Sequence, residues 1–219
     1  MARHAPTQIG EYMNPLASAT SQPRALLVLE DGTTFEGRCC GASGETFGEI
    51  VFNTSMTGYQ EIISDPSYAG QIVTLTYPQV GNYGIDPAVM QRDVLHLRGF
   101  VVHDMCYEPS NWTSKQSLPE FLQENGVVAI EGIDTRALTM HLRDHGAQKA
   151  AISTEDLDPA HLLARVQASP NISEHNFVPD VSVDAPHVVP ATSKKRFNVV
   201  AYDCGEKNGI LQGLAANGC

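Results

Sequence analysis

Apolar and polar residues are arranged in blocks through the centre of the chain, from residue 49 to residue 84. A short apolar run at 50–52 and a second run at 72–77, rich in β-branched residues, are typical of strands that bury one face. The segment between them carries many hydrogen-bonding side chains and includes the sequence DPSYAG, which favours a tight turn. Such a polar connection can hold a functional site, and it can equally be an ordinary surface loop with polar side chains.

The flanking residues predict further short elements. Asp31-Gly32, between apolar positions at 26–29 and residues 34–37, predicts an antiparallel hairpin. Ser117 and Glu120 have the spacing of a capping box, and Asp134 can cap a later helix. Strands are expected at 99–107, 127–130 and 149–152, and helices over 118–125, from 134 to about 145, and from 158 to about 169.

The last fifty residues change in character. Four prolines in 170–196 indicate a linker. Residues 197–202 form a nearly continuous apolar run, typical of a strand buried in a parallel sheet, and a helix is expected over 207–216. A lone strand and helix would leave two unpaired sheet edges, so we expect 191–219 to be poorly packed or aggregation-prone in isolation.

Composition indicates a soluble globular protein of one large or two modest domains. Hydrophobic residues make up 42% of the chain, yet no apolar run in it approaches the roughly 18 residues of a membrane helix. The 14 Lys and Arg against 25 Asp and Glu give a net charge of −11. This balance argues against nucleic acid or an anionic membrane as the main partner, since both bind basic patches.

The five cysteines are odd in number and lack metal-ligand spacing, which argues against a disulfide framework or a zinc site. A reducing cytoplasmic location fits this usage best. Residues 1–24 contain a single acidic residue, Glu11, and lack the apolar core of a secretory signal. We interpret them as a disordered extension; an organelle transit peptide is the alternative.

His141 and His145 are spaced as two metal ligands on one helix would be. No HExxH arrangement accompanies them, so we expect no metal site and assign both imidazoles a solvated or helix-dipole role. Asp134 and Arg136 are interpreted as a helix cap and a structural ion pair.

Three long strings carry a family resemblance: ALLVLEDGTTFEG at 25–37, FNTSMTGYQEIISDPSY at 52–68 and EGIDTRALTMHLRDHGA at 131–147. Together they closely resemble the small, glutamine-hydrolysing subunit of carbamoyl-phosphate synthase. The resemblance implies an α/β protein whose N-terminal domain has the swivelling β/β/α fold. A class I glutamine amidotransferase domain on a doubly wound, Rossmann-like sheet would follow, and this chain would contain its first strand and helix.

The resemblance divides the chain into four expected parts. Residues 1–24 form the extension, 25–169 the N-terminal domain, 170–196 the linker, and 197–219 the start of a truncated amidotransferase domain. The terminal motif departs from the family pattern Asp-x-Gly-x-Lys-x-Asn-Ile-Leu-Arg, because Gly209 and Gln212 replace its Asn and Arg.

Glutamine hydrolysis requires a thiolate, a histidine, a group that orients the histidine, and oxyanion donors. The family places the histidine and the glutamate that orients it in a His-Pro-Glu run, which does not occur in these 219 residues. Cys204 follows the first expected strand, where the family has no nucleophile. We therefore expect no catalytic residue here, and inactivity of the chain alone. Cys39, Cys40, Cys106 and Cys219 likewise match no family catalytic position.

Ser67 is the one functional residue that the resemblance carries over, as a contact to the substrate L-glutamine across the domain interface. The family's enzyme passes ammonia to a large subunit, which uses ATP, with Mg²⁺, and bicarbonate to make carbamoyl phosphate for pyrimidine and arginine synthesis. The resemblance thus implies a large-subunit partner and no cofactor in this chain. A non-catalytic docking module that binds the large subunit is the alternative function.

Overall fold

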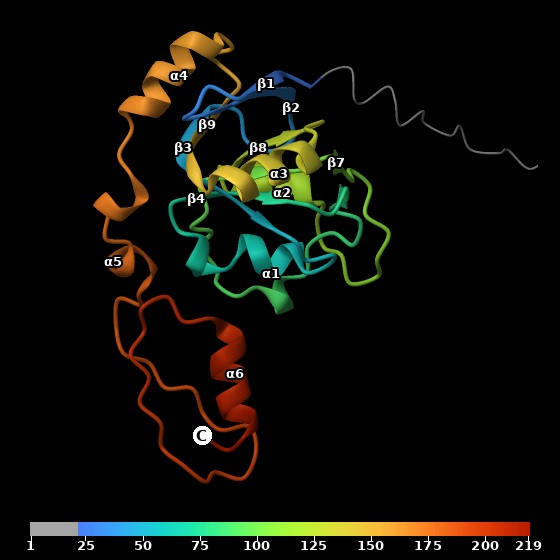
Figure 1. Ribbon diagram of the computed structural model, residues 1–219. Helices are drawn as coiled ribbons and strands as arrows, with labels where there is room; N and C mark the ends of the chain where they lie inside the picture. Colours follow the sequence, from blue (N-terminus) through green and yellow to red (C-terminus); the bar gives the residue numbers. More distant parts are fainter. Residues whose placement is uncertain (1–21) are drawn as a thin grey trace, which may run out of the picture.

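The computed structural model describes residues 22–219, and its centre is a closed barrel of seven strands (Figure 1). Around the barrel the strands follow the order β1-β2-β8-β6-β4-β3-β9. Their bounds are β1 Arg24–Leu29, β2 Thr34–Cys39, β3 Glu45–Asn53, β4 Gln71–Leu75, β6 Gly99–Val101, β8 Val128–Glu131 and β9 Gln148–Ser153. Two further short strands, β5 Gln79–Val80 and β7 Asp104–Met105, pair with each other outside the barrel.

Within residues 22–219, six α-helices and three short 3-10 turns connect these strands and follow them. The helices are α1 Tyr59–Ile63, α2 Leu118–Glu124, α3 Thr135–His145, α4 Pro159–Ala168, α5 Val178–Val181 and α6 Asn208–Ala216. The 3-10 turns are η2 Pro66–Tyr68, η3 Pro87–Val89 and η4 Ile172–Glu174.

The barrel joins antiparallel and parallel pairs. The predicted hairpin is confirmed, because β1 and β2 pair antiparallel through the Asp31-Gly32 turn. Strands β3, β4, β6 and β8 lie parallel to one another in sequence order. Strand β9 pairs antiparallel with both β1 and β3 and so closes the ring. The α/β class is thus confirmed, but the expected swivelling β/β/α arrangement is not, since the described sheet closes into a barrel.

Apolar side chains fill the barrel and the layer beneath each packed helix. Along β1, Leu27 and Leu29 belong to one buried cluster with Leu138 of α3, whereas Leu26 and Val28 pack with Leu162 of α4. Both faces of β1 are therefore buried, which explains its continuous apolar run. A third cluster holds α1 and α2 against the strands.

Helix boundaries agree with the capping signals. Ser117 and Glu120 form the predicted capping box at α2, Asp134 accepts the Ala137 N–H at the start of α3, and Asp158 caps α4. Among the described residues no ion pair joins Asp134 to Arg136. The strand predicted at 99–107 is divided into β6 and β7.

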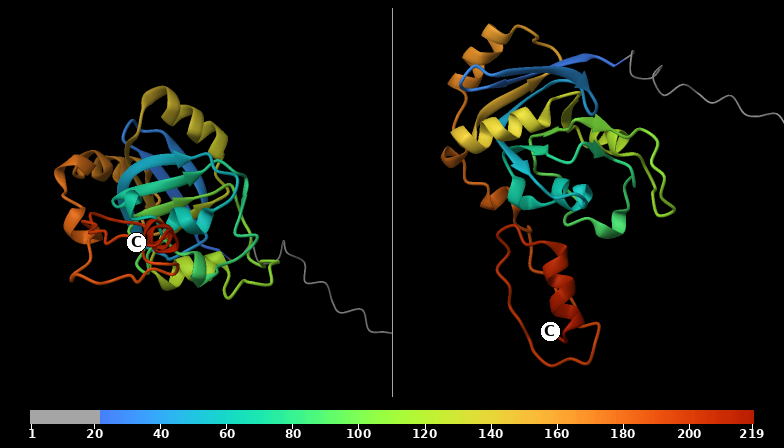
Figure 2. Two further views of the ribbon diagram at one scale, coloured as in Figure 1. Left: turned by 90° about the horizontal axis from the view of Figure 1, so that it is seen from below. Right: turned by 45° about the vertical axis from the view of Figure 1, so that its right-hand side comes forward.

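The central stretch is a parallel crossover. Strands β3 and β4 pair parallel, and the predicted polar loop between them contains α1 followed by η2. Helix α1 was not predicted, because its five residues lie within a polar string and carry no side-chain cap at Gly58. It lies on the side of the barrel that faces α6 (Figure 2).

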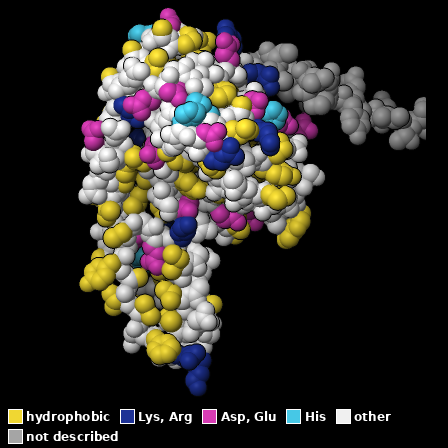
Figure 3. Space-filling view, viewed as in Figure 1, with side chains coloured by type: hydrophobic (Ala, Val, Ile, Leu, Met, Phe, Trp, Pro, Cys, Tyr) yellow, Lys and Arg dark blue, Asp and Glu magenta, His cyan; other side chains and the backbone are white. Residues whose placement is uncertain are grey.

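The predicted strand at 197–202 is wrong. These residues have no regular structure, and Val200 and Tyr202 are 84% and 92% exposed. A strand forms only where a neighbour completes its hydrogen bonds, and within residues 22–219 none pairs with this run. The helix predicted at 207–216 is confirmed as α6. We call residues 197–219 the C-terminal segment and 170–196 the linker; hydrophobic side chains are visible over the lower part of Figure 3, where this segment lies.

The predicted division of the chain into domains stays a prediction, and most of the 1–24 extension lies outside the described residues. Within 22–219, each helix is too short or too polar to cross a membrane.

Candidate functional site at the junction of the barrel and the C-terminal segment

Ser67 lies in the predicted tight turn, which the structure forms as η2. Asp65 accepts the Ser67 N–H through Oδ1 at 2.9 Å, and Pro66 occupies the first position of the turn. Proline fixes φ there and lacks an N–H that would need a partner. The Ser67 side chain is exposed, so its hydroxyl is available to a ligand as donor and acceptor. We call residues 65–68 the Ser67 turn.

The C-terminal segment contacts this turn directly. The second carboxylate oxygen of Asp65 lies 2.6 Å from Nζ of Lys207, and the Asp65 side chain is only 13% exposed. Pro66 is buried, and its Cβ lies 3.7 Å from the position of a Cβ on Gly205. Ser67 is therefore held at a junction between two segments that are remote in sequence.

A second ion pair joins the same two parts. Nη2 of Arg92 lies 2.7 and 2.6 Å from the two carboxylate oxygens of Asp203, and these side chains are 18% and 12% exposed. Burial alone would raise the pKa of Asp203, but hydrogen bonds from Arg92 and from the N–H groups of Glu206 and Gly205 outweigh it and lower the pKa to about 2. Asp203 is therefore ionised at neutral pH.

The backbone of the C-terminal segment is also tied to the barrel. The Asn208 N–H donates to the Gln91 carbonyl at 3.0 Å, and Gln91 Oε1 accepts the Gly209 N–H at 3.3 Å. These contacts lie at the start of α6, where backbone N–H groups have no partner within the helix. Gln91 thus supplies two of the acceptors that the helix start requires.

The linker packs over the junction. A Cβ at Gly70 would clash with the ring of Phe177, so the glycine allows the ring to lie directly on the backbone. Val181 is 7% exposed and lies against Gly205, and the Ser182 hydroxyl donates to the Asp203 carbonyl at 2.9 Å. The linker is therefore not a free spacer over 177–182.

Much of the polar central string supports the fold. The Tyr83 hydroxyl accepts the N–H groups of Gly58 and Tyr59 at 2.7 and 3.0 Å, and the two tyrosine rings stack with centroids 4.1 Å apart. Gln60 is 1% exposed and accepts the Asp86 N–H at 2.9 Å. These residues fix the start of α1.

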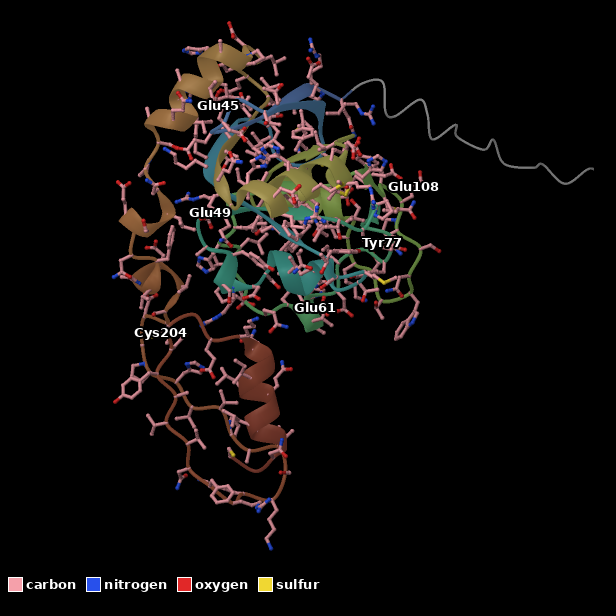
Figure 4. The ribbon with its side chains drawn as sticks, in the orientation of Figure 1. Glu45, Glu49, Glu61, Tyr77, Glu108 and Cys204 are labelled. Atoms are coloured by element: carbon pink, nitrogen blue, oxygen red, sulfur yellow. The ribbon has the colours of Figure 1, made fainter. Side chains whose placement is uncertain are left out.

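A hollow of about 300 Å³ opens beside Tyr83. Its lining includes Thr57, Gln60, Glu61, Asp86, Asn111 and Thr113. Figure 4 shows Glu61 on the barrel side that faces the C-terminal segment, and Tyr77 farther along the same part of the barrel. The sequence did not indicate this hollow, because it forms between α1 and a loop about fifty residues later.

Cys204 is exposed on the loop before α6 (Figure 4). Within residues 22–219, the hydrogen bonds of cysteine sulfurs run to backbone carbonyls, as in Cys39 to Gly41 and Ala42 at 3.4 Å and Cys106 to Glu108 at 3.4 Å. In this part of the chain no sulfur is hydrogen-bonded to an imidazole that would serve as its base.

One short sequence has the spacing of a nucleophile elbow, GRCCG at 37–41, with Cys39 between the glycines. The structure places Cys39 at the end of β2, 5% exposed, and the chain continues through a loop into β3 rather than into a helix. Burial raises the pKa of the adjacent Cys40 thiol well above its usual value. The geometry is that of packed core thiols.

His141 and His145 have different hydrogen-bond partners, the Asp31 carboxylate and the His141 carbonyl respectively. Their rings stack with centroids 4.4 Å apart, and Nε2 of His141 lies 2.6 Å from Oδ2 of Asp31. The described residues contain no group of three His, Cys, Asp or Glu side chains that could hold a metal ion. Asp31, the partner of His141, lies in the first hairpin, so the spacing between the two histidines does not reveal this contact.

Comparison with known proteins identifies the family. The family model for the carbamoyl-phosphate synthase small chain, CPSase domain, matches residues 27–152, which run from β1 to β9. The chain belongs to this family. The small chain of Syntrophotalea carbinolica is 47% identical over 90% of this chain and 55% of its own length. That of Nitratidesulfovibrio vulgaris is 48% identical over 89% and 56%.

The small chain of Thermotoga maritima is 50% identical over 87% of this chain and 48% of its own length. The chain thus spans about half the length of the curated relatives it matches. A psychrophilic subtilisin-like protease from Pseudoalteromonas sp. AS-11 matches with a TM-score of 0.31 and 10% identity, over 88% of this chain and 49% of that one. A similarity this weak carries no argument.

Proposed function

We propose that this chain is the N-terminal part of the small subunit of a glutamine-dependent carbamoyl-phosphate synthase, and that Ser67 contacts the glutamine substrate. The observation that supports this role most directly is the position of Ser67, exposed beside the contact between Asp65 and Lys207. An amino acid carries charged and amide groups, and a hydroxyl at a junction of two segments can hydrogen-bond to either.

The proposal leaves the covalent step to residues outside this chain. A thiolate, its histidine base and an oxyanion site would be supplied by the amidotransferase part that the longer relatives have room for. Ammonia would pass to a large subunit, which would bind ATP and Mg²⁺; this chain would bind neither. We propose a cytoplasmic location for the assembly, in line with its free cysteines.

The first test combines this chain with a carbamoyl-phosphate synthase large chain and assays carbamoyl phosphate with glutamine or with ammonia as nitrogen donor. We expect a stable complex that uses ammonia and not glutamine. Glutamine-dependent turnover that is lost in Cys204→Ser would overturn the assignment of catalysis to residues outside the chain. Absence of a complex would contradict the proposed large-subunit partner.

The second test addresses Ser67 in an enzyme that can hydrolyse glutamine: a large chain combined with a small chain in which this chain is joined to the amidotransferase part of a longer relative. We call this the assembled enzyme. Loss of one hydrogen bond to substrate in Ser67→Ala should raise KM for glutamine about tenfold and leave ammonia-dependent kcat unchanged. Ser110→Ala, which alters an exposed serine on the 107–116 loop, is the control. An unchanged KM in Ser67→Ala would contradict the proposed contact.

A further inference from the structure

Two ion pairs connect the barrel to the loop that leads into α6. Arg92 precedes β6 and pairs with Asp203, and Asp65 precedes η2 and pairs with Lys207. Asp203 and Lys207, the two partners in the C-terminal segment, are only four residues apart. We call residues 203–207 the Asp203 turn; it is held at both ends by charges of the barrel.

Asp203 collects hydrogen bonds from three parts of the chain. Its carboxylate accepts Arg92 Nη2 from the barrel, the Val183 N–H from the linker at 3.1 Å, and the N–H groups of Gly205 and Glu206 at 2.8 and 2.7 Å. This set occupies the lone-pair directions of both oxygens. Asp203 therefore fixes barrel, linker and turn to one another through a single group.

The second ion pair extends this connection to Ser67. Lys207 Nζ contacts one oxygen of Asp65, and the other oxygen accepts the Ser67 N–H at 2.9 Å. A displacement of the Asp203 turn thus moves the cation that orients the Asp65 carboxylate. Because Asp65 in turn orients the Ser67 turn, the position of the serine depends on residues more than a hundred positions away.

The burial of the first pair makes its two partners interdependent. Arg92 and Asp203 are 18% and 12% exposed, and Nε of Arg92 is buried without a hydrogen-bond partner among residues 22–219. Removing one partner of a pair in this setting leaves an uncompensated charge in a low-dielectric site. The exposed pair of Arg24 and Glu36, with side chains 68% and 72% exposed, has no such constraint.

We propose that Arg92 and Asp203 are positioning residues for the glutamine contact at Ser67. Their ion pair, which we call the clasp, holds the Asp203 turn against the barrel and so fixes the positions of Lys207, Asp65 and Ser67. The inference rests on the proposed function for the part that concerns glutamine. The clasp itself is a property of the chain and can be measured without any activity.

The first experiment measures amide hydrogen exchange of the Asp203 turn in this chain. Arg92→Met removes the positive charge of the pair, while the Asp203 carboxylate can still accept the N–H groups of Gly205 and Glu206. Exchange at Gly205 and Glu206 should rise about tenfold, the change that corresponds to loss of one charge-assisted hydrogen bond. Arg24→Met should leave it unchanged. Equal exchange in Arg92→Met and the parent chain would overturn the clasp.

A double-mutant cycle tests whether the pairing itself matters. Arg92→Met and Asp203→Asn should each loosen the turn, and the double variant should loosen it by less than the sum of the two effects in free energy, because an amide at 203 can still accept the Gly205 and Glu206 N–H groups. Circular dichroism and thermal unfolding report whether the barrel itself is intact. Strictly additive effects of the two substitutions, with an intact barrel, would show that the clasp does not depend on the pair.

The second experiment uses the assembled enzyme and separates the two proposals. Arg92→Met should raise KM for glutamine about tenfold, as Ser67→Ala does, without a change in ammonia-dependent kcat. If Ser67→Ala raises KM and Arg92→Met does not, the positioning role is overturned and the glutamine contact stands. If neither variant raises KM while exchange increases, the glutamine contact fails and the positioning role fails with it.

Discussion

The carboxylate of Asp31 lies 2.6 Å from Nε2 of His141, and this contact ties the first hairpin to helix α3 across 110 positions of sequence. Asp31 also accepts the Thr33 N–H at 2.9 Å and Gln148 Nε2 at 3.0 Å. Burial alone would raise the pKa of Asp31, but these hydrogen bonds outweigh it and hold the pKa of the carboxyl well below its usual range.

We expect Asp31→Asn to destabilise the protein more at neutral pH than in strong acid. A carboxyl whose pKa is lower in the folded state stabilises that state fully above its unfolded pKa, roughly 3.9, and this contribution declines as the pH falls from there through the folded pKa, which lies well below. The loss at pH 7 should be about 1 kcal/mol, a modest figure because the side chain is 35% exposed.

Urea denaturation of Asp31→Asn at about pH 7, 4 and 2 measures this dependence. Glu36→Gln is the matched control, since Glu36 pairs with Arg24 at a side chain that is 72% exposed. An equal difference between Asp31→Asn and the parent chain at every pH would mean that Asp31 acts through its shape rather than through its charge.

Lys149 closes the end of helix α4. Its Nζ donates to the carbonyls of Gln167 and Ser169 at 2.8 and 3.1 Å and lies 3.1 Å from Oε1 of Glu30, with the side chain 10% exposed. The final carbonyls of a helix have no partner within it, so the ammonium replaces the missing donors. Lys149→Met should cost about 1–3 kcal/mol of unfolding free energy, measured by urea denaturation. The exposed Lys115→Met should be neutral, and equal effects of the two would contradict this role.

Local signals in the sequence predicted the four longer helices well, but not the short α1 and α5. Ser117, Asp134 and Asp158 each cap a helix, because a side chain that accepts a hydrogen bond from a backbone N–H two or three residues later needs no information from the rest of the chain. The hairpin at Asp31-Gly32 was predictable for the same reason.

Long-range pairing was not predictable. Strand β9 pairs with β1 and β3, more than ninety residues earlier, and no local pattern indicates that the sheet closes there. The same limit produced the wrong strand at 197–202, since an apolar run specifies a strand only when a neighbour is present. At the candidate site, the turn that holds Ser67 was predictable from Asp65-Pro66, whereas the contacts of Arg92 and Lys207 were not.

Gly70 is a glycine position with a specific steric role. It adopts φ +80°, and the Phe177 ring occupies the space of a side chain. Gly70→Ala should therefore cost more than the roughly 1–2 kcal/mol of a left-handed alanine and should detach the linker. Faster protease cleavage within 170–185, together with a lower urea midpoint, would show this.

Two variants separate the clash from the backbone strain at Gly70. Gly126 has φ +68° with no atom within 4 Å of a Cβ, so Gly126→Ala reports the strain alone. In a Phe177→Ala background, Gly70→Ala should cost no more than Gly126→Ala does. Similar costs for Gly70→Ala with and without Phe177 would contradict the steric account.

The unpaired run at 197–202 should mediate self-association of this chain. Phe197, Val200 and Tyr202 are 56%, 84% and 92% exposed. The Phe197 N–H donates to the Gly218 carbonyl at 3.1 Å, but residues 198–202 make no backbone–backbone hydrogen bond within 22–219, so this extended apolar segment is a template for pairing with a second copy. Light scattering coupled to gel filtration should show oligomers that increase with concentration, and Val200→Lys should return the chain towards a monomer. Val188→Lys, at a linker position that is 90% exposed, should not, because the linker offers no comparable apolar run. If both variants reduced association equally, added charge rather than strand pairing would be the cause.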